Sequence, residues 1–194
     1  MYGLKIVRRR LERWEATFPV GQRDDRLERG VRKLATLASP PPPRVVYART
    51  EMALNSRLTA RRFQKQSGCC LGCPGDDSIE HYASCGCYYT FARRYVVVRR
   101  PPCYPVALEE FAGLGSLCSS VDATDGRRGL VPEEYDALRA CAVYALMRTH
   151  NAFRHGLATS VAAEAFRGFA CEAVRGSPRL AGLSRRRFYV GDGQ

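Results

Sequence analysis

The chain has 194 residues, 45% of them hydrophobic and 26% charged, which fits one globular domain or two small ones and excludes a disordered protein. No apolar run approaches the roughly 20 residues of a membrane-spanning helix, and the start lacks the long apolar segment of a secretory signal. We therefore expect a nuclear or cytoplasmic protein, not secreted, with no membrane partner.

The net charge of +12 is concentrated near the start of the chain. Residues 1–66 carry 16 Lys and Arg against 6 Asp and Glu, whereas residues 67–126 carry 4 against 7. A basic section of this kind favours a polyanionic partner, RNA or DNA, bound mainly through its phosphates. The alternative is an arginine-biased composition with no binding role.

The N-terminal part is predicted to be helical. Apolar residues recur at spacings of three and four from Leu4 onwards, so residues 1–39 should form basic N-terminal helices. Residues 40–43 are four consecutive prolines and should form a stiff, extended linker. Residues 44–66 resume a helical pattern that runs into a cysteine-rich loop, so residues 44–100 are predicted as a basic helix followed by a zinc knuckle.

Five of the nine cysteines fall between Cys69 and Cys87. Without a secretory signal, a disulfide framework is not expected. Zinc takes four tetrahedral thiolate and imidazole ligands, which a turn and a short helix capped by Ser78 can supply together. The predicted ligands of one structural zinc ion are Cys70, Cys73, His81 and Cys85.

Two alternatives exist within this cluster. Cys69 can replace Cys70, and Cys87 can replace Cys85. The spacing of four residues from His81 favours Cys85, because both side chains then share one helix face. The choice between Cys69 and Cys70 stays open. A chance cluster of free thiols is the alternative to any metal site.

The C-terminal part begins with a stretch, Tyr88 to Val98, that is predicted as a helix turning into a short strand, since Tyr95 to Val98 are aromatic or β-branched. Residues 101–131 read as a loop-rich connector. Residues 132–176 are predicted as a helical hairpin, packed through Leu138, Ala142, Ala145, Phe166 and Phe169.

A basic tail at 177–194 completes the chain. The predicted fold class is therefore mostly α, with a small zinc-stapled knuckle, made of a turn and a helix, set in a helical body. His150 and His155 are five residues apart and do not share a helix face, so they are predicted to be polar or capping residues and not a metal pair.

A family resemblance rests on Arg61-Arg62-Phe63-Gln64, the paired cysteines, and Asp77-Ser78-Ile79-Glu80-His81-Tyr82 with Cys85. Residues 49–87 resemble the zinc-binding segment downstream of the reverse transcriptase domain in non-LTR retrotransposon proteins. Residues 142–156 look like the helical region that follows there. The resemblance implies the same four ligands, Cys69 again as alternative, and a partner in the element's RNA or DNA target.

Nothing in the chain resembles the polymerase itself. The tripeptide Gly75-Asp76-Asp77 occurs in some polymerases, but it stands here inside a cysteine loop with no apolar strand before it. No nucleophile elbow, phosphate loop or dinucleotide fingerprint is present either. We therefore expect a binding protein that is not an enzyme, a detached or truncated C-terminal part of a retroelement polyprotein with other parts of that polyprotein as further partners.

The predicted nucleic-acid contacts are Arg57, Arg61, Arg62, Lys65, Arg93 and Arg94. Tyr82, Tyr88 and Tyr89 can either stack on single-stranded bases or pack around the knuckle. The alternative functions are a zinc-stabilised helical protein-interaction module and a non-functional retroelement relic.

Overall fold

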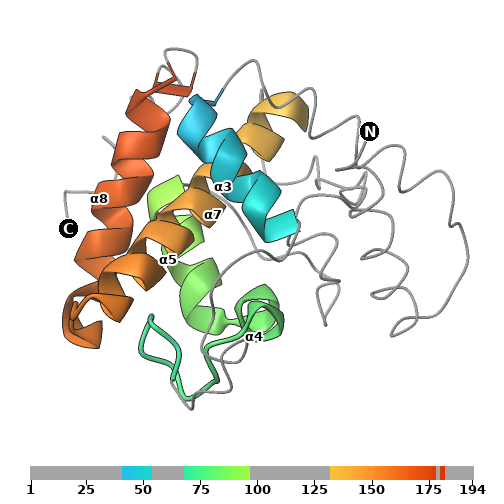
Figure 1. Ribbon diagram of the computed structural model, residues 1–194. Helices are drawn as coiled ribbons and strands as arrows, with labels where there is room; N and C mark the ends of the chain where they lie inside the picture. Colours follow the sequence, from blue (N-terminus) through green and yellow to red (C-terminus); the bar gives the residue numbers. More distant parts are fainter. Residues whose placement is uncertain (1–40, 54–67, 97–131, 178–179, 182–194) are drawn as a thin grey trace, which may run out of the picture.

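The computed structural model describes residues 41–53, 68–96, 132–177 and 180–181, most of them helical (Figure 1). In the described part no strand forms, apart from one isolated bridge between Gly68 and Asp76. The predicted mostly α fold class is confirmed. The elements, in chain order, are α3 (Pro43–Ala53), α4 (Ile79–Ser84), α5 (Gly86–Val96), α7 (Pro132–Arg154), η3 (Thr159–Val161) and α8 (Ala162–Arg175).

Within the described residues α7 is the central helix, and α3, α5 and α8 all pack against it (Figure 1). Every residue from 136 to 147 is buried, which is the pattern of a helix covered on all sides. Its buried faces include the small side chains of Ala140, Ala142 and Ala145, each fully buried, so neighbouring helices can approach closely. Pro132 is its first helical residue, where the missing N–H costs no hydrogen bond.

The predicted C-terminal hairpin is confirmed. After α7 the Gly156 N–H bonds to the Phe153 carbonyl and the Leu157 N–H to the Ala152 carbonyl, the two hydrogen bonds of a Schellman motif. The single turn η3 then leads into α8, which returns against α7. Phe166 is fully buried there, and Phe169 is half-buried.

Helix α3 corrects the predicted proline linker. Pro43 is the first residue of α3, so the last proline starts a helix instead of extending a spacer. The helix packs on α7, and the buried Arg49 donates from a terminal guanidinium nitrogen (NH1) to the Asp136 carbonyl at 2.8 Å. Burial, followed by the nearby Arg139, lowers the pKa of Arg49 to about 10.

Helix α5 corrects the predicted strand. Tyr95 and Val96 belong to the helix, although both favour strands by propensity. Val96 lies on the buried face of α5 together with Tyr88 and Ala92, at spacings of four, and this face packs on α7 and α8. Tertiary packing therefore decides the conformation of this segment.

The predicted segments do not form separate cores within the described residues. One cluster of buried side chains contains members from α3, the cysteine loop, α4, α5, α7 and α8. The predicted N-terminal helices at 1–39, the end of the basic helix at 54–66, the connector at 101–131 and most of the tail lie outside the described residues. Among the helices that are described, none is long and apolar enough to cross a bilayer.

Candidate metal centre

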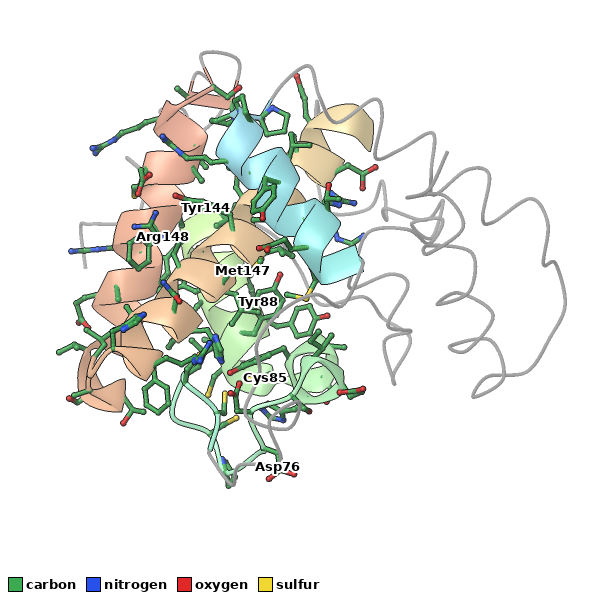
Figure 2. All side chains as sticks on the ribbon, viewed as in Figure 1. Asp76, Cys85, Tyr88, Tyr144, Met147 and Arg148 are labelled. Carbon is green, nitrogen blue, oxygen red and sulfur yellow. The ribbon has the colours of Figure 1, made fainter. Side chains whose placement is uncertain are left out.

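The cysteine loop brings together four side chains with metal-binding atoms. These atoms lie within 4.8 Å of one another and belong to Cys69, Cys73, His81 and Cys85. The loop precedes α4 at one end of the helical body, with Asp76 near its tip and Cys85 at the junction with α5 (Figure 2). The prediction that cysteine and histidine side chains converge here is confirmed, and the group can hold a metal ion.

The spacing of the ligand atoms suits a tetrahedral ion. The Sγ atom of Cys85 lies 3.8 Å from that of Cys69 and 3.6 Å from that of Cys73. Thiolates bound at 2.3 Å to one tetrahedral ion are about 3.8 Å apart. The Nε2 atom of His81 lies 3.0 Å from the Cys73 sulfur and completes the group.

Local sequence explains how the loop reaches this geometry. The Cys69 carbonyl accepts a hydrogen bond from the Gly72 N–H at 3.0 Å, and Gly72 has φ +84, a conformation that favours glycine. The side chain of Ser78 caps α4 by accepting from the His81 N–H at 3.0 Å, as predicted. Gly75 lies directly against the His81 imidazole, where a Cβ atom would overlap the ring.

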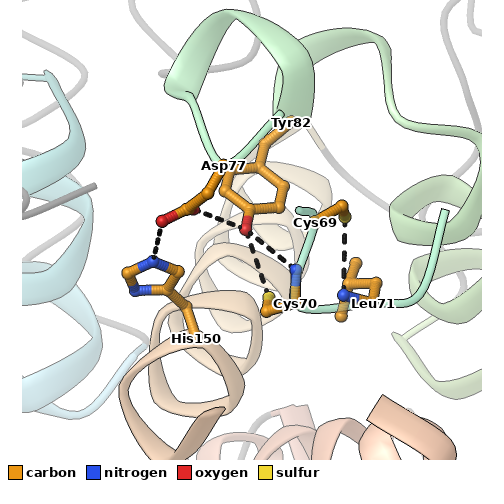
Figure 3. Close-up of polar contacts among 6 residues, drawn as sticks. All are labelled: Cys69, Cys70, Leu71, Asp77, Tyr82 and His150. Carbon is orange, nitrogen blue, oxygen red and sulfur yellow. Dashed lines mark hydrogen bonds and ion pairs between the residues drawn. The ribbon is translucent and has the colours of Figure 1, made fainter. Parts of the chain in front are cut away.

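The structure places Cys69, and not Cys70, in the cluster, which corrects the preferred ligand. The Cys69 sulfur accepts the Leu71 N–H at 3.4 Å, whereas the Cys70 sulfur faces the Tyr82 hydroxyl at 3.3 Å (Figure 3). Hydrogen bonding from the Cys70 thiol, then from Cys85, holds the pKa of Cys69 well below its ordinary value. The same Cys69 contact, then burial, raises the pKa of Cys70, whose sulfur is not a member of the four-residue group.

Cys87 also stays outside the four-residue group and lies half-buried against the core. Burial raises its pKa. Cys85 is the member of this pair that joins the group by its position, although contact with Cys69, then burial, raises the pKa of its thiol as well. It follows the last residue of α4 and its sulfur accepts the Tyr88 N–H at 3.4 Å, so a backbone donor at the start of α5 also faces the site.

A buried polar network that the sequence did not predict ties the loop to the helical body (Figure 3). His150 of α7 donates from Nε2 to an Asp77 carboxylate oxygen at 2.9 Å, since a carboxylate can only accept. The other carboxylate oxygen accepts the Tyr82 hydroxyl at 2.9 Å. Asp77 is 3% exposed, and these two donors compensate part of the cost of burying its carboxylate. This use of His150 agrees with the prediction of a polar and not a metal-binding role.

Most of the predicted nucleic-acid residues lie outside the described residues, namely Arg57, Arg61, Arg62 and Lys65. Arg93 and Arg94 are described and exposed, in the last turn of α5. The alternative of tyrosines as stacking surfaces is not supported, because the structure buries all three in the core. Their exposed fractions are 2% for Tyr82, 2% for Tyr88 and 7% for Tyr89.

Comparison of this chain with protein-family models, curated proteins and solved structures finds no match in any of the three. The resemblance to the zinc-binding segment of retrotransposon proteins stays a prediction from residues 49–87 and 142–156. The structure adds the positions of the four candidate ligands. It also adds two contacts that hold the loop in place: Gly75 against the His81 ring, and the hydrogen bond between Asp77 and His150.

Proposed function

We propose that this chain is a zinc-stabilised helical protein that binds nucleic acid and has no catalytic activity, the C-terminal part of a reverse-transcriptase-type retroelement protein. One observation carries the proposal: three thiols and one imidazole meet within 4.8 Å of one another, and the Cys85 sulfur lies 3.8 and 3.6 Å from the other two sulfurs, close to the edge of a tetrahedral zinc site. Such a ligand set is typical of structural zinc, because no coordination position remains for substrate or water.

The chemistry of the donor set supports zinc over other ions. Three sulfurs and one nitrogen in a tetrahedral arrangement match zinc, whereas magnesium and calcium require oxygen ligands. Two backbone N–H groups, of Leu71 and Tyr88, donate to the sulfurs of Cys69 and Cys85, a contact that stabilises negative charge on sulfur when a metal ion is bound. When bound, the ion would fix the turn at Cys69–Cys73 against α4.

Nucleic-acid binding is supported by charge. The net charge is +12, and Arg93 and Arg94 extend from the last turn of the helix that starts at the metal site. Guanidinium groups bind phosphates with two parallel hydrogen bonds, so arginine suits this task. The predicted Arg57, Arg61, Arg62 and Lys65 would extend the contact along the chain before the loop.

A salt titration tests this function. Binding of a labelled RNA and a labelled duplex DNA is measured by fluorescence anisotropy from 50 to 200 mM salt. With roughly five phosphate contacts, affinity for duplex should fall several-hundred-fold over this range, because counterions are released on binding. Replacing Arg61 and Arg62 with alanine should flatten the slope while the circular dichroism spectrum stays unchanged. Affinity that is indifferent to salt would leave the protein-interaction module as the better function.

A further inference from the structure

An open hollow of about 730 Å³ lies where the end of α8 meets the start of α3. In Figure 1 this junction is at the opposite end of the molecule from the cysteine loop. Arg167 and Arg175 are eight residues apart on one face of α8, and Arg44 of α3 joins them in the lining. We call this surface the arginine hollow; its other lining residues are Gly168, Cys171, Glu172 and Gly176.

Positive charge dominates the arginine hollow. Glu172 is its single carboxylate, and that group is already engaged: it lies 3.4 Å from Arg44 Nε and accepts the Tyr144 hydroxyl at 3.0 Å. Arg148 lies beside this network, 3.3 Å from the Tyr144 hydroxyl (Figure 2). Within the described residues, neither Arg167 nor Arg175 has a hydrogen-bond or ion-pair partner, so both guanidinium groups are available to an anion.

An exposed aromatic ring lies one helical turn from Arg44, at the edge of the arginine hollow. Tyr47 follows Arg44 by three residues on α3, so the two side chains share a face, and it is 65% exposed. The only other large hydrophobic side chain that is exposed in the described part is Val161. An exposed ring at the edge of a surface that carries unpaired guanidinium groups suits single-strand binding, in which a base stacks while its phosphates are held.

We propose that the arginine hollow binds single-stranded nucleic acid, with Arg167 and Arg175 on phosphates and Tyr47 as a stacking ring. This inference rests on the proposed function and moves part of it to a surface that sequence patterns did not indicate. An acidic protein segment would use the arginines but gain little from the ring. A preference for single strands over duplex, dependent on Tyr47, therefore separates the two kinds of partner.

The first test compares charge removed inside and outside the hollow. The salt slope is the change in the logarithm of the binding constant with the logarithm of salt concentration. Arg167→Ala combined with Arg175→Ala should lower the magnitude of this slope for a single-stranded oligonucleotide by about 1.4, since two phosphate contacts are lost. Arg154→Ala removes an exposed arginine that does not line the hollow and should leave the slope nearly unchanged. An equal change in slope per arginine removed in the double variant and in Arg154→Ala would show a response to net charge alone and would overturn the inference.

The second test places a charge in the hollow without disturbing the fold. A Cβ at Gly168 would meet nothing within 4 Å, so both Gly168→Glu and Gly168→Gln should fold. The two variants match in size, and the glutamate variant should bind the oligonucleotide clearly more weakly. Equal affinities for the pair would contradict the proposed surface.

The third test addresses stacking. Tyr47→Ala should weaken single-strand binding at least about fivefold and change duplex binding much less. Equal losses on both substrates, or none, would exclude Tyr47 as a stacking ring. If wild type binds nucleic acid but ignores all the hollow variants, the inference fails while the proposed function stands. If wild type binds no nucleic acid, both fail.

Discussion

The cysteine loop and the helical body are stabilised in different ways. The body is built around α7, whose residues 136–147 are all buried, so it gains stability from the removal of apolar surface from water. The loop at 68–78 has little regular structure and contributes only Cys69, Cys70 and Leu71 to the buried core, so it depends more on polar contacts and on the candidate metal ligands. The body should therefore fold without the ion, whereas the loop should not.

Metal removal tests this difference and should have the largest effect. Chelation, or Cys73→Ser, should remove hydrogen-exchange protection from the amides of residues 68–84, because an ion bound by these residues would link the turn to α4. Amides in the centre of α7 should stay protected. Loss of protection throughout both regions would show that body and loop form one cooperative unit and would contradict the distinction.

The contact between the two regions can be broken without touching the ligands. His150→Ala removes one hydrogen-bond donor from the buried Asp77 carboxylate, which should cost roughly 1–3 kcal/mol of unfolding free energy. His155→Ala is the matched control, since His155 is exposed and its loss should cost no more than about 0.5 kcal/mol. Chemical denaturation measures both. Similar costs for the two histidines would exclude an anchoring role for His150.

Gly75 tests the position of the imidazole within the loop. In Gly75→Ala the new Cβ would overlap the His81 ring, so the ring must leave its place and metal affinity should fall about 10- to 100-fold. Gly86→Ala adds the same methyl group where nothing lies within 4 Å and should leave affinity unchanged. A competition titration against a zinc chelator gives both affinities. An undiminished affinity in Gly75→Ala would mean that His81 is not a ligand.

The smallest effect is expected for a thiol inside the body. Burial raises the pKa of Cys141 to about 12, so at pH 8 its thiolate fraction is about a thousandfold below that of an ordinary thiol. Alkylation of the folded protein should therefore spare Cys141 while the half-buried Cys171 reacts, as read by mass spectrometry of the peptides. Raising the pH towards 12 should speed the reaction of Cys141. Early labelling of Cys141 would show that the body opens readily.

Local sequence signals predicted much of this architecture. Pro132 and Gly156 mark the limits of α7, and Ser78 caps α4, because these features depend on neighbouring residues only. Long-range packing decided the rest. The tendency of Tyr95 and Val96 towards a strand gives way to the buried face of α5.

In the candidate site, too, neighbouring residues determine some features and long-range packing determines the others. Cys73, His81 and Cys85 follow from spacing, but adjacent cysteines cannot be told apart in that way. The path of the turn decides between them: it directs the Cys69 sulfur towards Cys85 and leaves the Cys70 sulfur at Tyr82. His150 and Asp77 are 73 residues apart, and only the fold brings them together.

The most direct test of a zinc centre made by Cys69, Cys73, His81 and Cys85 is zinc K-edge X-ray absorption on the purified protein and on two variants. Wild type and Cys70→Ser should each hold one zinc, with three sulfurs at about 2.3 Å and one nitrogen at about 2.0 Å. Cys69→Ser should lose one sulfur or the ion. Loss of a sulfur in Cys70→Ser but not in Cys69→Ser, or a folded wild-type chain without zinc, would contradict the account.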